Sequence, residues 1–251
     1  MKKLLLGTVL AGLSLQPAAA HFGMIIPSDP IFGGNEDRMI SATFGFAHPF
    51  EAEGMVLEAP LAAQVTVNGA STDIDLTAAT VLDAPGFVAD IEIARPGAHI
   101  LSMVPQPYWE PAEDVFIQHF TKTYVAAYSD DSGWDAMLGF PVEIEPLSRP
   151  FAQWAGNMFQ GVVTQNGEPV PFAEVEVEFY SPEGALDISD ELFVTQSVKA
   201  DGNGVFSYVA PWGGWWGFAA LMEGPDTIAF DGEEKAVEQG AVIWVNFEEA
   251  P

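Results

Sequence analysis

The sequence predicts an all-β protein made of two β-sandwich domains. Three observations support this fold class. Short runs alternate between apolar and polar residues, turn residues separate these runs, and almost no stretch shows helical periodicity. With 251 residues, of which 49% are hydrophobic, the chain has enough apolar material for a sizeable core.

Residues 1–20 have the features of a secretory signal peptide. Two lysines precede a short apolar run that ends in the small residues Ala18–Ala20, and the run is too short to span a bilayer comfortably. Cleavage after Ala20 would make His21 the first residue of the mature chain. We therefore expect the mature protein to be in the periplasm, without a membrane-spanning segment.

Residues 21–145 are expected to form the first sandwich. Its strongest local signal is the Asn68-Gly69 pair, which is typical of a tight hairpin turn between two strands. The number and spacing of the strand-like runs indicate an immunoglobulin-like arrangement. These runs are Met39–Phe46, Gln64–Val67, Gly86–Ile93, His99–Val104 and Gln118–Tyr128.

Residues 151–251 are expected to form a smaller second sandwich after a linker at Glu145–Pro150. The run Ala173–Tyr180 alternates cleanly between valine or phenylalanine and glutamate, and Asn166-Gly167 marks another hairpin. The order of strands and turns is similar to the transthyretin or carboxypeptidase-regulatory type of domain, which by itself implies no activity. The other expected strands are Phe159–Thr164, Thr195–Ala200, Val205–Tyr208, Trp215–Leu221 and Ala241–Phe247.

The composition excludes several classes of function. The formal charge of −28 becomes −30 when Lys2 and Lys3 leave with the signal peptide, and such a chain repels nucleic acid and anionic lipid. There are no cysteines, so a metal site would need histidine, carboxylate, methionine, amide or backbone ligands. No nucleotide-binding loop or serine nucleophile motif occurs, so we expect no enzymatic activity.

Histidine is the residue type that points most directly to a function. As the first residue of the mature chain, His21 would offer an α-amine and an imidazole to one metal ion, a pair that suits nickel, copper and zinc. His48 and His119 would join it if the chain end lies along a sheet edge, whereas His99 has no acidic neighbour close by. The alternative for each is a hydrogen-bonded loop residue without a metal. The carboxylates available nearby are Glu51, Glu110, Glu113 and Asp114.

Five stretches of the chain match one family pattern: His21–Ser28, Phe46–Glu51, Gln106–Asp114, Phe120–Thr123 and Gly214–Leu221. Together they resemble a bacterial periplasmic accessory family linked to nickel and cobalt uptake by energy-coupling-factor transporters. The resemblance covers essentially the whole mature chain. This resemblance implies a protein that binds Ni²⁺ or Co²⁺ and passes it to membrane transporter components. It also implies that the metal ligands are His21, His48 and His119, with Glu51 and Glu110 as further candidates.

Two other functions remain open. Two β-sandwiches with tryptophans at Trp212, Trp215 and Trp216 are compatible with a metal-free carbohydrate-binding or adhesion module, although these rings also suit a core. An N-terminal histidine paired with a second histidine is compatible with a copper histidine-brace oxidative enzyme. Titration with Ni²⁺, Co²⁺, Cu²⁺ and Zn²⁺ would separate the three functions.

Overall fold

The structure, a computed structural model, describes residues 21–34, 38–184 and 186–251. The expected signal peptide at residues 1–20 therefore lies outside the described residues. The described chain consists almost entirely of β-strands in three sheets, which confirms the predicted fold class. Its one helical segment is the short 3₁₀ turn η1 (Glu191–Phe193). No helix in these residues is long and apolar enough to cross a membrane.

Sheet A contains five strands, four of them in the order β1-β3-β8-β7, with β4 paired to β3. All the pairings are antiparallel. The strands are β1 (Phe22–Pro27), β3 (Met39–His48), β4 (Glu53–Met55), β7 (Thr77–Val81) and β8 (Ala84–Glu92).

Sheet B contains eleven strands and runs through the middle of the molecule. Its main order is β17-β16-β19-β20-β11-β9-β5-β6, with β2 and β10 on β11 and β13 on β20. The strands from the first half are β2 (Ile31–Phe32), β5 (Ala62–Val67), β6 (Ala70–Asp73), β9 (Gly97–Val104), β10 (Tyr108–Glu110) and β11 (Val115–Ala127). Those from the second half are β13 (Gln153–Trp154), β16 (Glu174–Phe179), β17 (Gln196–Lys199), β19 (Gly214–Phe230) and β20 (Glu233–Glu248).

Sheet C contains four strands around β14. Strands β12 and β18 flank it, and the short β15 also pairs with it. The strands are β12 (Val142–Pro146), β14 (Met158–Gln165), β15 (Glu168–Pro169) and β18 (Val205–Val209).

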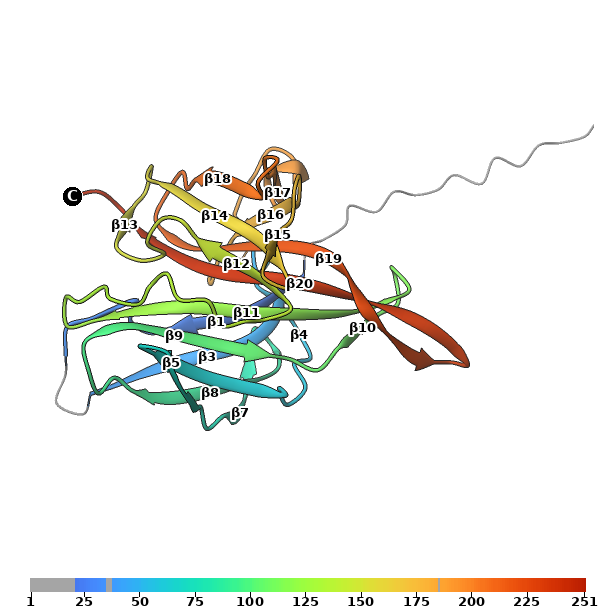
Figure 1. The fold of residues 1–251 in the computed structure, drawn as a ribbon, viewed down its shortest axis with the longest axis horizontal. Helices are drawn as coiled ribbons and strands as arrows, with labels where there is room; N and C mark the ends of the chain where they lie inside the picture. The colour runs from blue at the N-terminus through green and yellow to red at the C-terminus, as the bar shows by residue number, and fades with distance from the viewer. Residues whose placement is uncertain (1–20, 35–37, 185) are drawn as a thin grey trace, which may run out of the picture.

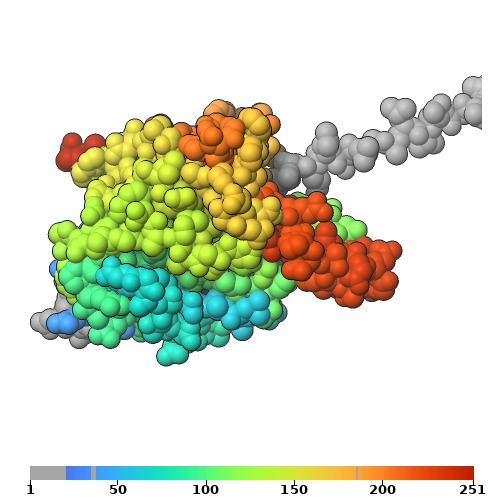
Figure 2. Space-filling model, viewed as in Figure 1, coloured from blue at the N-terminus to red at the C-terminus, as the bar shows by residue number. Residues whose placement is uncertain are grey.

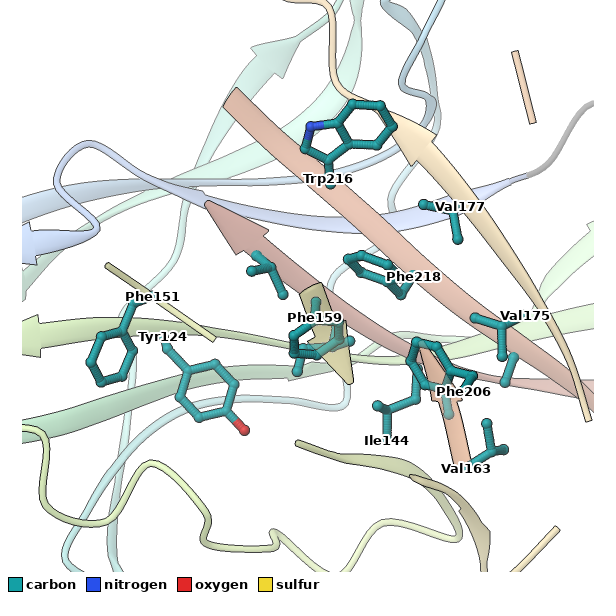
Figure 3. Packing of buried hydrophobic residues seen from close by; sticks show 14 of the residues in the cluster. Tyr124, Ile144, Phe151, Phe159, Val163, Val175, Val177, Phe206, Trp216 and Phe218 are labelled. Atoms are coloured by element: carbon teal, nitrogen blue, oxygen red, sulfur yellow. The ribbon is translucent and has the colours of Figure 1, made fainter. Parts of the chain in front are cut away.

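Sheet B is the middle of three layers, with sheet C on one face and sheet A on the other (Figure 1). Because side chains alternate along a strand, successive residues of β11 contribute to different cores. Tyr124 belongs to the core that also contains Phe159 and Phe206 of sheet C (Figure 3), whereas its neighbour Val125 belongs to the core that contains Phe44 of sheet A. Both sandwiches therefore share one sheet.

A third, smaller core lies where β1 crosses the second half of sheet B. Phe22 and Met24 of β1 are fully buried against Trp244 and Val242 of β20 and Ala219 of β19. The rings of Phe22 and Trp244 meet edge to face at 5.8 Å. This core fixes the beginning of β1 on the face of sheet B.

The pairing between β11 and β20 joins the two halves of the chain. These strands run parallel, with Phe116–Lys122 opposite Val237–Ile243. In addition, β12, which we placed at the end of the first domain, pairs with β14 of the second half. The division into 21–145 and 151–251 stays a prediction, and hydrogen-bonded sheets cross it.

Strands β19 and β20 continue beyond the body as a two-stranded arm, residues 223–238, seen in red at the right of Figures 1 and 2. The arm turns at Asp231-Gly232, where both residues have positive φ, as a tight hairpin requires. Near the turn, the ring of Phe230 packs 4.4 Å from Trp109 and 5.6 Å from Phe116. Contacts with β10 and β11 thus hold the arm.

Candidate functional site

The pairing of β1 with β3 brings His21 and His48 together. Phe22 lies opposite Ala47, so the next pair along this antiparallel ladder is His21 and His48. The two imidazole centroids are 4.7 Å apart, with the rings at 74° to each other. The structure therefore brings together two of the histidines that the sequence predicts as ligands.

Glu110 lies beside the same pair. Its Oε2 is 3.2 Å from Nε2 of His21, and the two side chains are only 11% and 13% exposed. The carboxylate is held at the end of β10, because its Oε1 accepts a hydrogen bond of 2.9 Å from the backbone N–H of Ala112. Glu110 thus places a fixed carboxylate next to the His21 ring.

Aromatic rings enclose the imidazole of His21. Phe46 stacks on it with a centroid distance of 5.8 Å and an interplanar angle of 16°. Tyr108 lies 6.5 Å from it and 5.1 Å from Phe46. These contacts restrict rotation of the His21 ring and keep it largely from water.

His119, on β11, lies next to Phe46 and packs between Gly23 of β1 and Gly240 of β20. Its Nδ1 accepts a hydrogen bond of 3.3 Å from the backbone N–H of Gly23. Both neighbouring strands need glycine here, since a Cβ at Gly23 would overlap Thr121 Oγ1 and one at Gly240 would lie 2.8 Å from Nε2 of His119. The carbonyl of Gly23 in turn accepts a 2.7 Å hydrogen bond from Nε1 of Trp244.

Burial keeps two of these imidazoles neutral. Burial, and to a smaller extent the nearby charge of His21, lowers the pKa of His119 to about 3. The pKa of His21 is also lowered, first by burial and then by the charge of His48, while Glu110 opposes the shift. Neutral imidazole is the form that binds metals.

Two ring nitrogens of the site are buried without a hydrogen-bond partner among the described residues: Nε2 of His48 and Nε2 of His119. They are not equivalent. Because Nδ1 of neutral His119 accepts from Gly23, its proton is on Nε2, and His119 offers no free lone pair. Nε2 of His48 is under no such constraint and is available to a ligand.

No group of three or more histidine, aspartate, glutamate or cysteine side chains in the described part of the chain is arranged to hold a metal ion. Side chains alone therefore do not form a complete site. The α-amine that cleavage before His21 would create is a further donor, and it belongs to the backbone.

Glu51, another predicted candidate, lies in the exposed turn after β3. Its charge acts on Glu178 of β16, a carboxyl group that is 1% exposed. Burial raises the pKa of Glu178 to about 8 and that of Glu176 to about 7, with other glutamates adding to both shifts. Glu51 thus interacts with the glutamates of β16 and does not take part in the contacts around His21.

The remaining sequence candidates lie elsewhere. His99 is buried on β9, where its Nδ1 is 3.2 Å from the carbonyl of Gly97. Trp216 is buried in the core, with Trp212 at 5.3 Å. Trp212 also lines a largely apolar cavity of about 780 Å³ together with Phe50.

Sequence reasoning missed Gly23, Phe46 and Tyr108, which shape the site. A glycine inside an apolar run is a signal for close approach of another strand, and Gly23 fits this rule. Nothing local in the sequence marks Phe46 or Tyr108, because their roles depend on the pairing of distant strands.

Comparison with known proteins gives a family. No curated protein matches the chain. Among solved structures, the D00-D0 domain of intimin has 10% identity, covering 89% of this chain and 99% of that one, with a TM-score of 0.22. The fibronectin(III)-like modules of Clostridium thermocellum CbhA have 11% identity, covering 90% and 95%, with a TM-score of 0.22. Mouse nectin-like molecule 4 has 11% identity, covering 88% and 63%, with a TM-score of 0.23.

These structural similarities are too weak to support any argument about function. The family comparison is more extensive, because the family described as "Domain of unknown function (DUF4198)" matches residues 18–224. That range contains β1, β3, β10 and β11, which carry all the residues around His21. The chain belongs to this family of unknown function.

Proposed function

We propose that the protein binds one divalent transition-metal ion, with Ni²⁺ as the preferred ion and Co²⁺ as an alternative, at the pair His21 and His48. The observation that carries this proposal is Nε2 of His48, a buried nitrogen that has no hydrogen-bond partner among the described residues and whose ring centroid is 4.7 Å from that of His21. A buried polar atom without a partner is costly, and a bound ligand would remove that cost.

Three nitrogen donors would form the site. The α-amine and imidazole of His21 would chelate the ion, and Nε2 of His48 would add the third donor. This set needs only two side chains, which agrees with the lack of a three-side-chain site in the described residues. Nickel(II) accepts nitrogen-rich tetragonal sites, and water would complete its coordination. His119 would join only if Gly23 released its Nδ1.

Delivery of the ion to a membrane transporter in the periplasm is the second part of the proposal. It is supported by the signal-like residues 1–20 and by the resemblance of His21–Ser28 and Gln106–Asp114 to an uptake accessory family. The charge of −28 would also concentrate cations around the protein. Cells without the protein should accumulate less nickel at low external concentration, and the wild-type gene but not a His21→Ala version should restore accumulation.

Binding is tested by calorimetric titration of the signal-cleaved protein with Ni²⁺, Co²⁺, Cu²⁺ and Zn²⁺. Mass spectrometry first establishes that the chain starts at His21. We expect one tight Ni²⁺ site that is lost in His21→Ala and strongly weakened in His48→Ala. Weak binding at many sites, unchanged in both variants, would contradict the proposal and favour a metal-free module.

A matched control isolates the α-amine. A chain that begins at Ala20 keeps both imidazoles but places the amine one residue away from the His21 ring. We expect this chain to lose tight binding although its fold is unchanged. Equal affinity in the two chains would show that the amine is not a ligand.

Copper is the second candidate, and the same pair of rings supports it. An N-terminal histidine with one further histidine also suits Cu²⁺, because imidazole is a ligand for copper as well as for nickel. Tight binding of Cu²⁺ with negligible binding of Ni²⁺ would favour a copper histidine brace over nickel transport.

A further inference from the structure

The largely apolar cavity beside Trp212 has no part in the proposed metal site. Residues 186–196, which include η1, form most of its wall, and its volume of about 780 Å³ is typical of binding sites. We call it the Trp212 groove. The apolar side chains that line it and that matter below are Phe50, Leu186, Ile188, Leu192, Phe193 and Trp212.

Apolar side chains at the rim of the Trp212 groove face water. Leu192 is 84% exposed and Phe193 is 56% exposed, and Leu186 and Trp212 are also exposed. The turn that carries the first two is fixed, because the side chain of Asp190 accepts a 3.0 Å hydrogen bond from the N–H of Leu192. Single exposed apolar residues are common, but several around one cavity mark an interaction site.

Trp212 forms a rigid wall of the groove. Its ring packs 5.6 Å from that of Phe179 and 5.3 Å from that of the buried Trp216. The carbonyl of Trp212 also accepts a 3.2 Å hydrogen bond from Nε1 of Trp216. A tryptophan that is already fixed loses little conformational freedom on binding, and tryptophan is frequent among the residues that dominate binding energy.

The rim of the groove is acidic. Residues 186–196 contain Asp187, Asp190 and Glu191 and no basic residue, in a chain whose formal charge is −28. Such a rim attracts a partner with lysine or arginine and repels an acidic one. A second copy of this chain and an anionic membrane both have the wrong charge.

We propose that the Trp212 groove is the docking site of a partner protein, which inserts apolar side chains into the cavity and places lysine or arginine beside Asp187 and Glu191. A small molecule inside the cavity would leave Leu192 exposed, whereas a protein segment would also cover the rim. A saccharide would gain little from the aliphatic Leu186 and Ile188. This inference goes beyond the proposed function and does not depend on metal binding.

The position of the groove suits a partner that receives the ion. Phe50 in its wall follows His48 by two residues. The carbonyl of Pro49, in the same turn, accepts a 3.0 Å hydrogen bond from the N–H of Ser181. A docked partner would therefore lie beside the turn that carries His48.

Fluorescence polarisation with dye-labelled peptides tests the docking site on the signal-cleaved protein. The probe is a peptide in which leucine and phenylalanine alternate with lysine. One control peptide has serine in place of its apolar residues, and another has glutamate in place of its lysines. At physiological ionic strength we expect saturable binding of the probe alone, because binding needs both the apolar contact and the opposite charge.

Variants locate the bound peptide. Phe193→Ser and Trp212→Ala should weaken binding about tenfold or more. The matched control is Phe172→Ser, since Phe172 is 62% exposed and lies outside the groove, and it should bind like the wild type. Asp187→Asn with Glu191→Gln should weaken binding and reduce its salt dependence. Removing the same charge from exposed positions elsewhere, with Asp75→Asn and Glu168→Gln, should have little effect. Circular dichroism confirms that each variant is folded.

Several outcomes would overturn the proposal. One is the lack of saturable probe binding, and another is equal binding by Phe193→Ser and Phe172→Ser. Flotation with vesicles of phosphatidylethanolamine and phosphatidylglycerol, lost only in Phe193→Ser, would assign the groove to a membrane. A dimer in sedimentation that disappears only in Phe193→Ser would assign it to a second copy. Displacement of the probe by cello-oligosaccharides would assign it to a saccharide.

Discussion

The buried ion pair between Lys122 and Glu143 offers the most quantitative test of the fold. The side chains are 1% and 2% exposed, and Nζ is 2.6 Å from Oε1. Glu143 also accepts three backbone hydrogen bonds, from Leu138 at 2.9 Å, Gly139 at 3.0 Å and Phe140 at 3.3 Å. The carboxylate thus has four donors, whereas the ammonium group depends mainly on one acceptor.

This asymmetry predicts unequal costs. Glu143→Leu leaves a buried ammonium group and three unsatisfied N–H groups, and should lower the free energy of unfolding by about 3–5 kcal/mol. Lys122→Met removes one charge-assisted hydrogen bond but leaves the carboxylate with three donors, and should cost about 1.5–3 kcal/mol. In the double variant no buried charge remains, so its cost should be less than the sum of the two.

Urea unfolding followed by circular dichroism gives the free energy of unfolding of the wild type, the two single variants and the double variant. In thermal unfolding of a chain of this size, a loss of about 3–5 kcal/mol would lower Tm by roughly 6–20 °C. The reasoning is refuted if Lys122→Met costs as much as Glu143→Leu, or if the two effects are additive.

Three further predictions concern pH and packing. Because burial raises the pKa of Glu178 to about 8 from its usual 4.5, this group contributes stability that is complete below pH 4.5 and is lost as the pH rises through about 8. Thermal unfolding between pH 5 and 9 should show this loss, and Glu178→Gln should reduce it; an identical pH profile would contradict it. Gly23→Ala should cost about 1–3 kcal/mol, because its Cβ would overlap Thr121, and should also weaken metal binding; unchanged urea unfolding and affinity would refute this. Ni²⁺ affinity should fall roughly tenfold per pH unit below about pH 7 as the α-amine takes up a proton, and competition titration would detect a flat profile if the amine is not a ligand.

Much of the fold follows from local patterns in the sequence. The expected hairpins at Asn68-Gly69 and Asn166-Gly167 are present, and all four residues have positive φ. The alternating run that predicts a strand at Ala173–Tyr180 forms β16, with its valines in the core. These features were predictable because their physical causes lie within a few residues.

Strand β1 shows why the rest was not predictable. Phe22–Pro27 is buried on both faces, with Ile25 in the core between sheets A and B and Phe22 and Met24 in the third core, so its sequence does not alternate and gives no strand signal. The arm at 223–238 was not predictable for the opposite reason, because it is mostly exposed and its sequence has little apolar pattern.

Prediction of the candidate site needs both the residue types in the sequence and the pairing of distant strands. Histidine chemistry singled out His21 and His48 from the sequence, but their contact follows from the register of β1 on β3. The 3.2 Å contact between Glu110 and Nε2 of His21 follows from the pairing of β10 with β11, which no local sequence pattern indicates.

The shared middle sheet has a consequence for how the molecule comes apart. Val125 and Tyr124 are neighbours on β11, yet they belong to the cores of different sandwiches, and β11 is hydrogen-bonded to β20 near the end of the chain. Loss of either core would expose one face of the same strand. The protein should therefore unfold in a single cooperative transition. During synthesis the first half would remain incomplete until β20 is made, so folding of the first half would be completed only after β20 has left the ribosome.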